Sequence, residues 1–277
     1  MRWMKLLLRN PVLLVVMVFM LSGPGQAGDE YGLSQLVKQL YTQPDFNLQH
    51  SAAAMSLLKR LNSGEIKLVR NAILARHQYR FKSHLLEQYF TNHFKDYKPN
   101  TQQVTLTAQD EENVSVIKTV EQDIHNYENS EAGLRAQMVG VWIPGPAIGG
   151  GAMPQNYTFK GDGTFIFDIG EGGCDIRIAT SSGTWIINKN VLTLTTTHEK
   201  RYIGGKLKPV TDPVGCLSDN ELAGGKWQTV QLKAADVKRY TKLRFVYEDY
   251  FGEGDFKPRF KMDKGEWWLY SKSTTNN

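Results

Sequence analysis

The stretch VRNAILARHQYRFKSHLLEQYFTNHFKDYKPN, residues 69–100, decides how the first half of the chain folds. It opens inside a helical pattern whose apolar face carries Ile66, Val69 and Ile73, with Ala72 along its edge. Aromatic side chains follow that can supply much of a small helical core: Tyr79, Phe81, Tyr89, Phe90, Phe94 and Tyr97. We therefore expect this stretch to organise a small all-α domain.

Helical patterns flank the stretch on both sides. Residues 32–41 repeat leucine and valine at helical spacing, and Ser51 is suited to cap a short helix after them. Ser63 can cap the helix at 65–77, and Thr107 with Asp110 forms a capping-box-like start for another helix. These patterns predict an all-α domain over residues 28–130, followed at 131–138 by a polar linker or a short connecting helix.

A recurring set of residues runs through this half of the chain: Arg70-Asn71, Ile73, Ala75-Arg76-His77, Tyr79, Phe81, Leu86, Tyr89-Phe90, Tyr97, Pro99, Leu106-Thr107 and Glu112-Asn113. The set resembles the YARHG domain, a module of exported bacterial proteins. The sequence departs from that pattern at Leu74, Gln78 and Asp96, where the family has Tyr, Gly and often Trp. The resemblance implies a small helical module in an exported protein.

Gln78 raises a question about the end of the helix at 65–77. If the family's glycine takes a positive φ there, glutamine costs on the order of 1 kcal/mol at this position. Alternatively the helix runs one residue further.

The resemblance directs attention to Arg76, His77, Tyr79 and Tyr97 as candidate binding residues. Arg76 and His77 have a structural alternative, in which they tie the tight loop after the helix to the following helix through backbone carbonyls. Both interpretations remain open at the level of the sequence.

The first 27 residues have the organisation of a secretory signal peptide. Arg2, Lys5 and Arg9 precede an apolar run at 11–21, and small residues lead to a predicted cleavage after Ala27. The run is short for a membrane span, which needs ~20 residues, although an uncleaved anchor is the alternative. We therefore expect a periplasmic or secreted protein without a stable membrane span after cleavage.

Cleavage would also remove most of the positive charge. The formal net charge of +5 falls to +2 when Arg2, Lys5 and Arg9 are lost. A near-neutral chain lacks the broad basic field of a nucleic-acid-binding protein, so we do not expect nucleic acid as a partner.

The chain contains two cysteines, Cys174 and Cys216. An even number of cysteines in an exported chain favours a disulfide, which could contribute ~4 kcal/mol. A metal or redox pair would need CxxC spacing or neighbouring histidines, and the sequence has neither.

From residue 139 the sequence changes to short β-rich runs separated by turns, such as Asp162-Gly163. We predict an α plus β protein of two domains, the second an antiparallel barrel or sandwich of about eight to ten strands at 139–277. Gly140-Val141-Trp142 and the Gly183-Thr184-Trp185 unit resemble those of lipocalin-like barrels. The resemblance implies that Trp142 either plugs the barrel floor or contacts a small apolar ligand.

Two glycine-rich segments, 144–153 and 204–225, are expected as loops at the mouth of this barrel. The first lacks the Gly-Lys-Ser/Thr ending of a phosphate-binding loop. If the barrel holds a ligand, we expect it beside these loops.

The sequence gives no pattern for catalysis, metal binding or a cofactor. It contains no G-x-S-x-G or H-E-x-x-H motif. His77, His84 and His93 lie close in sequence, but no two of them are spaced i, i+4. We therefore predict no catalytic residues, no metal ligands and no cofactor.

These observations favour an exported, non-enzymatic binding protein of the bacterial cell envelope. The helical module would recognise an envelope component or protein, and the barrel a small apolar ligand or a second partner. An inhibitor or immunity protein against an envelope-attacking enzyme is the alternative, and a hydrolase of unknown substrate is a weaker one.

Overall fold

A computed structural model describes residues 31–145, 154–170, 173–210, 218–249, 253–262 and 265–272. The predicted signal peptide at 1–27 lies outside these residues, as does nearly all of the glycine-rich segment at 144–153. None of the helices in the described ranges is long and apolar enough to cross a membrane.

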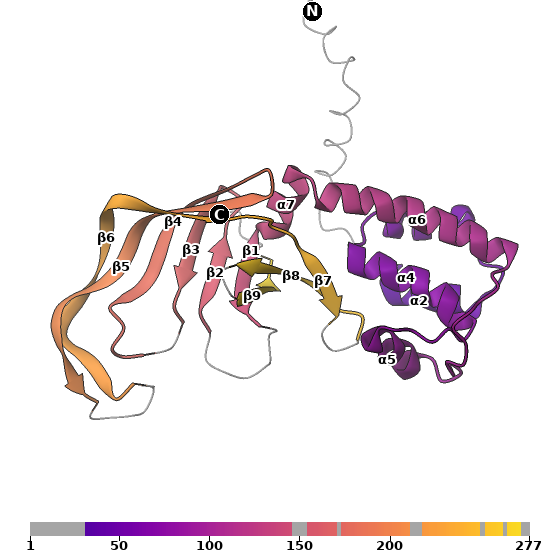
Figure 1. Ribbon diagram of the computed structural model, residues 1–277, viewed down its shortest axis with the longest axis horizontal. Coiled ribbons are helices and arrows are strands. Elements are labelled where there is room, and N and C mark those ends of the chain that lie inside the picture. Colours follow the sequence, from indigo (N-terminus) through magenta and orange to yellow (C-terminus); the bar gives the residue numbers. More distant parts are fainter. Residues whose placement is uncertain are drawn as a thin grey trace, which may run out of the picture.

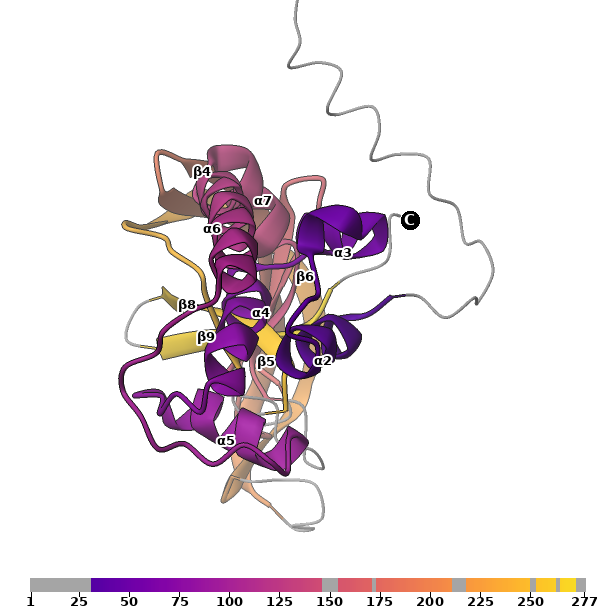
Figure 2. The same ribbon diagram turned by 90° about the vertical axis from the view of Figure 1, so that its right-hand side faces the viewer.

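The N-terminal half is helical, as the sequence predicts (Figure 1). Its elements are α2 (Leu33–Thr42), the short 3-10 helix η2 (Leu48–His50), α3 (Ala52–Leu58), α4 (Ser63–Arg76), α5 (His84–His93) and α6 (Ala108–Glu128). Figure 2 looks onto this end of the molecule and shows α2, α4 and α6 in front of the sheet. These helices and their connections enclose one apolar core.

Helix α4 is the centre of the helical unit. It contacts α2 and α6. Six of its apolar side chains, which point in several directions around the helix, are at most 1% exposed: Ile66, Leu68, Val69, Ala72, Ile73 and Ala75. A helix that is buried on most of its surface has no wide polar face, which explains the weakly amphipathic sequence of this segment.

The two ends of α4 decide between the alternatives left open by the sequence. Asn62, rather than Ser63, is the N-cap, and it forms a capping box in which Glu65 accepts the backbone N–H of Asn62 at 2.8 Å. The expected Ser63 cap is wrong because the helix begins one residue earlier. At the other end, Gln78 has a φ of +60° and ends the helix where the family pattern has glycine.

The second half forms one nine-stranded antiparallel sheet with the order β6-β5-β4-β3-β2-β1-β9-β8-β7. The strands are β1 (Gly140–Pro144), β2 (Asn156–Phe159), β3 (Thr164–Asp168), β4 (Ile178–Asn188), β5 (Val191–Pro209), β6 (Asn220–Tyr240), β7 (Val246–Asp249), β8 (Phe256–Met262) and β9 (Gly265–Ser271). The two-domain α plus β organisation is thus confirmed at this level.

The predicted closed barrel or sandwich is wrong, because β6 and β7 remain the two ends of an open, curved sheet in the described residues (Figure 1). Helix α7 (Glu131–Met138) accounts for part of the difference. Its Leu134 and Met138 share the core of the sheet with Trp185 and Leu192. A helix therefore covers apolar area that closing strands would cover in a barrel. Residues 131–138 form the short connecting helix, which was the alternative to a polar linker.

The segment at 204–225 also differs from the prediction of a loop. β5 continues to Pro209 and β6 begins at Asn220, and the two strands pair through Gly204 opposite Gly225. Glycine weakens a strand signal in the sequence, yet here the pairing continues through both glycines.

The helical unit and the sheet contact each other where α4 begins. A Cβ on Gly64 would lie 2.5 Å from the ring of Phe256 and 2.9 Å from Cβ of Tyr247, so glycine permits this close approach. The Tyr247 hydroxyl donates to Gln137 Oε1 at 3.1 Å, and Gln137 Nε2 donates to the Glu128 carbonyl at 2.8 Å. These contacts join β7 to the end of α6 and to α7.

Cys174 lies in the described residues, whereas Cys216 does not. The flanks of the two cysteines contact each other, since Ser218 Oγ donates to Asp175 Oδ1 at 2.6 Å and the Leu222 N–H donates to the Cys174 carbonyl at 2.8 Å. These contacts support the expected disulfide, which stays a prediction.

In protein exported to an oxidising compartment, we expect alkylation of the denatured but unreduced chain to label neither Cys174 nor Cys216. The Cys174→Ser variant should lose up to ~4 kcal/mol of unfolding free energy, because the bridge restricts the unfolded chain. Intact mass and denaturant unfolding measure the two effects. Two labelled thiols in the exported wild-type protein would refute the pairing.

Candidate functional site

Arg76 and His77, the two motif residues at the end of α4, converge on one buried carboxylate. Arg76 Nη2 donates to Asp110 Oδ1, and His77 Nε2 lies 2.8 Å from Asp110 Oδ2. Asp110 is 0% exposed and sits in the first turn of α6, where it also accepts the Thr107 N–H at 3.1 Å. The motif thus joins the end of α4 to the start of α6.

Arg76 extends this network to α2. Its Nη1 donates to the carbonyls of Leu40 at 2.9 Å and Gln43 at 3.2 Å, where α2 ends. Carbonyls at a helix C-terminus lack partners within the helix, and a cation there is favourable. Backbone carbonyls are therefore among the partners of Arg76, but they belong to α2 and its C-cap and not to the following helix, as was expected.

Burial, together with the neighbouring Arg76 guanidinium, lowers the pKa of His77 below its ordinary value. A neutral imidazole can still donate its Nε2 proton to Asp110. We therefore assign His77 the neutral tautomer that carries this proton.

Tyr79 and Tyr97 belong to an aromatic cluster that is separate from the network around Asp110. The Tyr97 hydroxyl is buried and donates to the Tyr79 carbonyl at 2.6 Å, while the Tyr79 ring meets Phe81 edge-on at 5.2 Å. Burial raises the pKa of Tyr97 far above its ordinary value. The two tyrosines fix the turn after α4 to the segment that follows α5.

Trp142, the candidate from the second half, is 0% exposed in the core of the sheet. Its Nε1 donates to the Met138 carbonyl at 2.7 Å, and its ring meets Phe260 edge-on at 4.7 Å. The structure thus places the five candidate residues at three separate locations, and none of them lines either of the two cavities described below.

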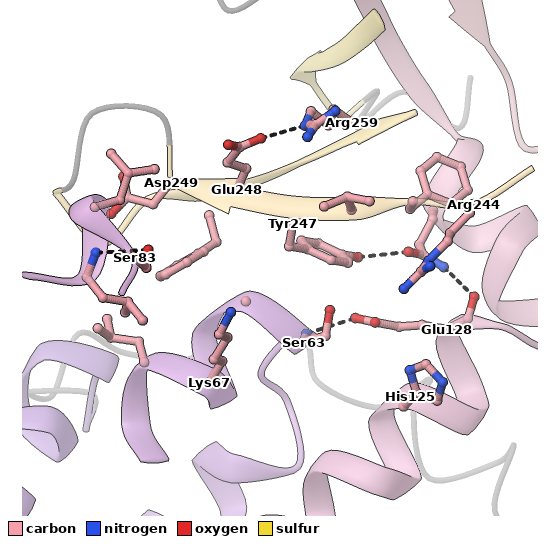
Figure 3. Close-up of a pocket in the computed structure, with 18 of the residues that line it drawn as sticks. Ser63, Lys67, Ser83, His125, Glu128, Arg244, Tyr247, Glu248, Asp249 and Arg259 are labelled. Atoms are coloured by element: carbon pink, nitrogen blue, oxygen red, sulfur yellow. Dashed lines mark hydrogen bonds and ion pairs between the residues drawn. The ribbon is translucent and has the colours of Figure 1, made fainter. Parts of the chain in front are cut away.

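A cleft of about 370 Å³ lies where the helical unit meets β7 and β8 (Figure 3). Its walls come from the start of α4, the start of α5, the end of α6 and the residues around β7: Ser63, Lys67, Ser83, Leu85, His125, Glu128, Arg244, Tyr247, Asp249 and Arg259 are among them. The residues are far apart in sequence, so spacing alone could not reveal the cleft.

The acidic groups of the cleft already have donors. The Glu128 carboxylate accepts the Ser63 N–H at 3.0 Å, and Glu248 is paired with Arg259 at 2.6 Å. Asp249 is 5% exposed and accepts the N–H groups of Glu253 at 3.1 Å and Gly254 at 2.7 Å. Burial raises the pKa of Glu128, while the hydrogen bond from Ser63 opposes that shift.

Two cationic side chains of the cleft, unlike its acidic groups, have no partner of opposite charge among the described residues. Lys67 projects from α4 and Arg244 from the segment before β7, and Figure 3 shows both side chains directed into the space between the two units. Within the described ranges, neither Lys67 nor Arg244 forms an ion pair. The arrangement therefore suits an anionic group that enters from solvent.

A second hollow, of about 490 Å³, lies on the concave face of the sheet. Its lining includes the aromatic residues Tyr157, Phe167 and Trp267 and the charged residues Glu199 and Lys238. Of the two segments beside which a ligand was expected, only 144–153 contributes to this lining in the described residues, through Pro144, and the small apolar ligand stays a prediction. No group of three or more potential metal-binding side chains occurs in the described part of the chain.

Residues 41–122 match the YARHG domain family. The match begins at Tyr41, near the end of α2, and it includes Asp110 and one of the two carbonyl acceptors of Arg76, that of Gln43. It supports the helical part of the prediction and an exported protein. Comparison with curated proteins and with solved structures gave no match.

Asp110 is the residue that the sequence interpretation did not connect to Arg76 and His77. Its capping-box position was a visible signal, but a capping box predicts contacts within the first turn only. The side chains of Arg76 and His77 reach it from a helix more than thirty positions earlier, with separations of 34 and 33 residues.

We expect Arg76→Met to lower the free energy of unfolding by about 3–5 kcal/mol, because it leaves the carboxylate of Asp110 buried without its main cationic partner. Arg70→Met on the same helix is the matched control. Arg70 pairs with Glu121 at a partly exposed site, where the side chains are 28% and 25% exposed, and loss of that pair should cost no more than about 1 kcal/mol. Urea unfolding monitored by circular dichroism measures both values, and equal losses would contradict the assigned role of Asp110.

His77 should make stability fall on acidification. Its pKa in the folded protein lies below the unfolded value of about 6.5, so the unfolded chain binds the proton more readily. As the pH decreases through about 6.5, the unfolding free energy of the wild type should fall more steeply than that of His77→Gln. His84→Gln, at the exposed start of α5, is the control. Parallel pH profiles for the wild type and His77→Gln would contradict this assignment.

Proposed function

We propose that this protein is an exported, non-enzymatic binding protein of the bacterial cell envelope, and that the cleft between its two units receives an anionic group. The observation that carries the proposal is the pair Lys67 and Arg244, two cations directed into one cleft without ion-pair partners in the described residues. The YARHG match and the predicted signal peptide support an envelope or extracellular location.

Each unit contributes one of the two cations. Lys67 belongs to the helical unit and Arg244 to the sheet unit, and the contact of Gly64 with Phe256 holds the two walls together. The proposal therefore treats the helical module and the sheet as one binding unit in which neither half is sufficient alone.

The chemistry of the pair defines the class of partner. A guanidinium binds a carboxylate or phosphate through paired N–H donors, and an ammonium adds a second positive charge. Leu85 and Phe256 add apolar surface to the same cleft. An envelope component or an envelope protein that presents a carboxylate or phosphate beside an apolar group fits these features.

The polar groups in the cleft support binding in preference to catalysis. Ser83 caps α5 by accepting the Leu86 N–H at 3.4 Å, and His125 Nδ1 lies 3.3 Å from the amide of Asn129. Neither the cleft serines nor His125 forms a hydrogen-bonded nucleophile–base pair in the ranges described. We therefore propose retention of an unchanged ligand.

The test uses the exported, processed protein with a photo-crosslinking amino acid in place of Leu85. Irradiation in intact cells should yield a defined adduct, and Lys67→Glu with Arg244→Glu should reduce its yield at least tenfold, because each lost charge-assisted contact costs about 1.5–3 kcal/mol. The matched control, Lys95→Glu with Lys118→Glu, reverses two exposed lysines of the helical unit outside the cleft and should leave the yield unchanged.

Mass spectrometry of the adduct identifies the partner and shows whether it is intact. Equal adduct yields in the cleft variant and the control variant would remove the cleft from the proposal. Recovery of a cleaved partner would instead favour the hydrolase alternative.

A further inference from the structure

The pair of strands β5 and β6 extends beyond the rest of the sheet. β4 pairs with β5 only as far as Ile178 opposite Arg201, so residues 202–209 of β5 pair with β6 alone. We call residues 202–209 and 220–227 the outer ribbon. It projects from the end of the molecule opposite the helical unit (Figure 1).

The outer ribbon exposes large apolar side chains. Ile203, Leu207 and Trp227 are 42%, 54% and 43% exposed, and they make up three of the nine exposed large apolar residues in the described part of the chain. This concentration within one two-stranded projection is unusual for a soluble surface and indicates a contact region.

The apolar side chains lie on both faces of the ribbon. Tyr202 pairs with Trp227 and therefore shares a face with it, and their rings meet edge-on at 5.3 Å. Ile203, the next residue along β5, points to the opposite face. A flat protein partner would cover one of these faces and leave the other exposed.

Lysines surround the apolar side chains. Lys206, Lys208 and Lys226 accompany one acidic residue, Glu221, which gives the outer ribbon a net charge of +2. Lys200 lies at its base, with Nζ 6.0 Å from the centre of the Trp227 ring. All four lysines are exposed, and none forms an ion pair in the described ranges.

The ribbon is held in place on the protein side. The Tyr202 N–H donates to the Arg177 carbonyl at 2.9 Å, and Arg177 Nη1 donates to the Gly204 carbonyl at 3.1 Å. The Leu222 N–H donates to the Cys174 carbonyl at 2.8 Å. The segment before β4 therefore braces both strands, so the exposed side chains are presented in a fixed arrangement.

We propose that the outer ribbon docks on an anionic membrane surface. A ribbon that enters the headgroup region is surrounded by it, so the apolar side chains on both faces become covered. Tryptophan favours the membrane interface, and the aliphatic parts of the lysines can lie along apolar surface while their ammonium groups reach lipid phosphates. Attachment here is peripheral and leaves the chain outside the bilayer core.

The test measures flotation of the exported, processed protein with lipid vesicles. The protein should bind vesicles of phosphatidylglycerol and phosphatidylcholine and should not bind phosphatidylcholine alone. Lys206→Glu with Lys208→Glu should weaken binding at least tenfold. The matched control, Lys95→Glu with Lys118→Glu, reverses two exposed lysines of the helical unit and should bind as the wild type does.

A second readout reports the depth of Trp227. Lipids brominated on their acyl chains should quench the fluorescence of the wild type, and Trp227→Phe should lose most of this quenching. Equal binding to neutral and anionic vesicles, or equal binding by the ribbon and control variants, would overturn the proposal. Equal affinity for soluble polyglutamate without bromine quenching would assign the lysines to an acidic macromolecule instead.

Discussion

The buried carboxylate of Asp110 is the constraint on which the helical unit depends. A buried charge is costly unless it is paired and hydrogen-bonded. Here Arg76 and His77, at the end of α4, and the N–H of Thr107, at the start of α6, supply the partners of Asp110. Arg76 also binds the last carbonyls of α2. Asp110 and its partner Arg76 therefore fix the relative positions of three helices, α2, α4 and α6.

The same constraint positions the cleft. Because α4 is fixed at its C-terminal end by the Asp110 network, its first turns have a defined direction toward β7 and β8. Gly64 then allows the ring of Phe256 to approach the helix, and Lys67 faces Arg244 across the space that remains. The Asp110 network and Lys67 thus lie toward opposite ends of one helix, so the network that fixes the end of α4 also sets the position of Lys67.

Features that depend on local sequence patterns were predictable from the sequence. Features that depend on contacts between residues far apart in the chain were not. Helical spacing located α2 and α6, and the Thr107–Asp110 box marked the start of α6. The choice of Asn62 over Ser63 as the cap was not predictable, because both residue types suit the position. An open sheet instead of a closed barrel follows from the packing of α7 on its core, and a polar-looking segment such as 131–138 gives little sign of that role. The cleft combines residues from both units, so no local pattern contains it.

The positions of the outer ribbon and the cleft determine how the two proposed surfaces would work together. The outer ribbon and the helical unit occupy opposite ends of the molecule, with the body of the sheet between them (Figure 1). A ribbon docked on a membrane would therefore hold the helical unit away from that membrane, with the cleft open to solvent at the junction. Because both proposed surfaces select anionic groups, the separation between them decides whether lipid charge acts on the cleft. Salt screens lipid charge over a Debye length of about 8 Å, and the body of the sheet lies between the docked ribbon and the helical unit, so a separate anionic partner could bind in the cleft.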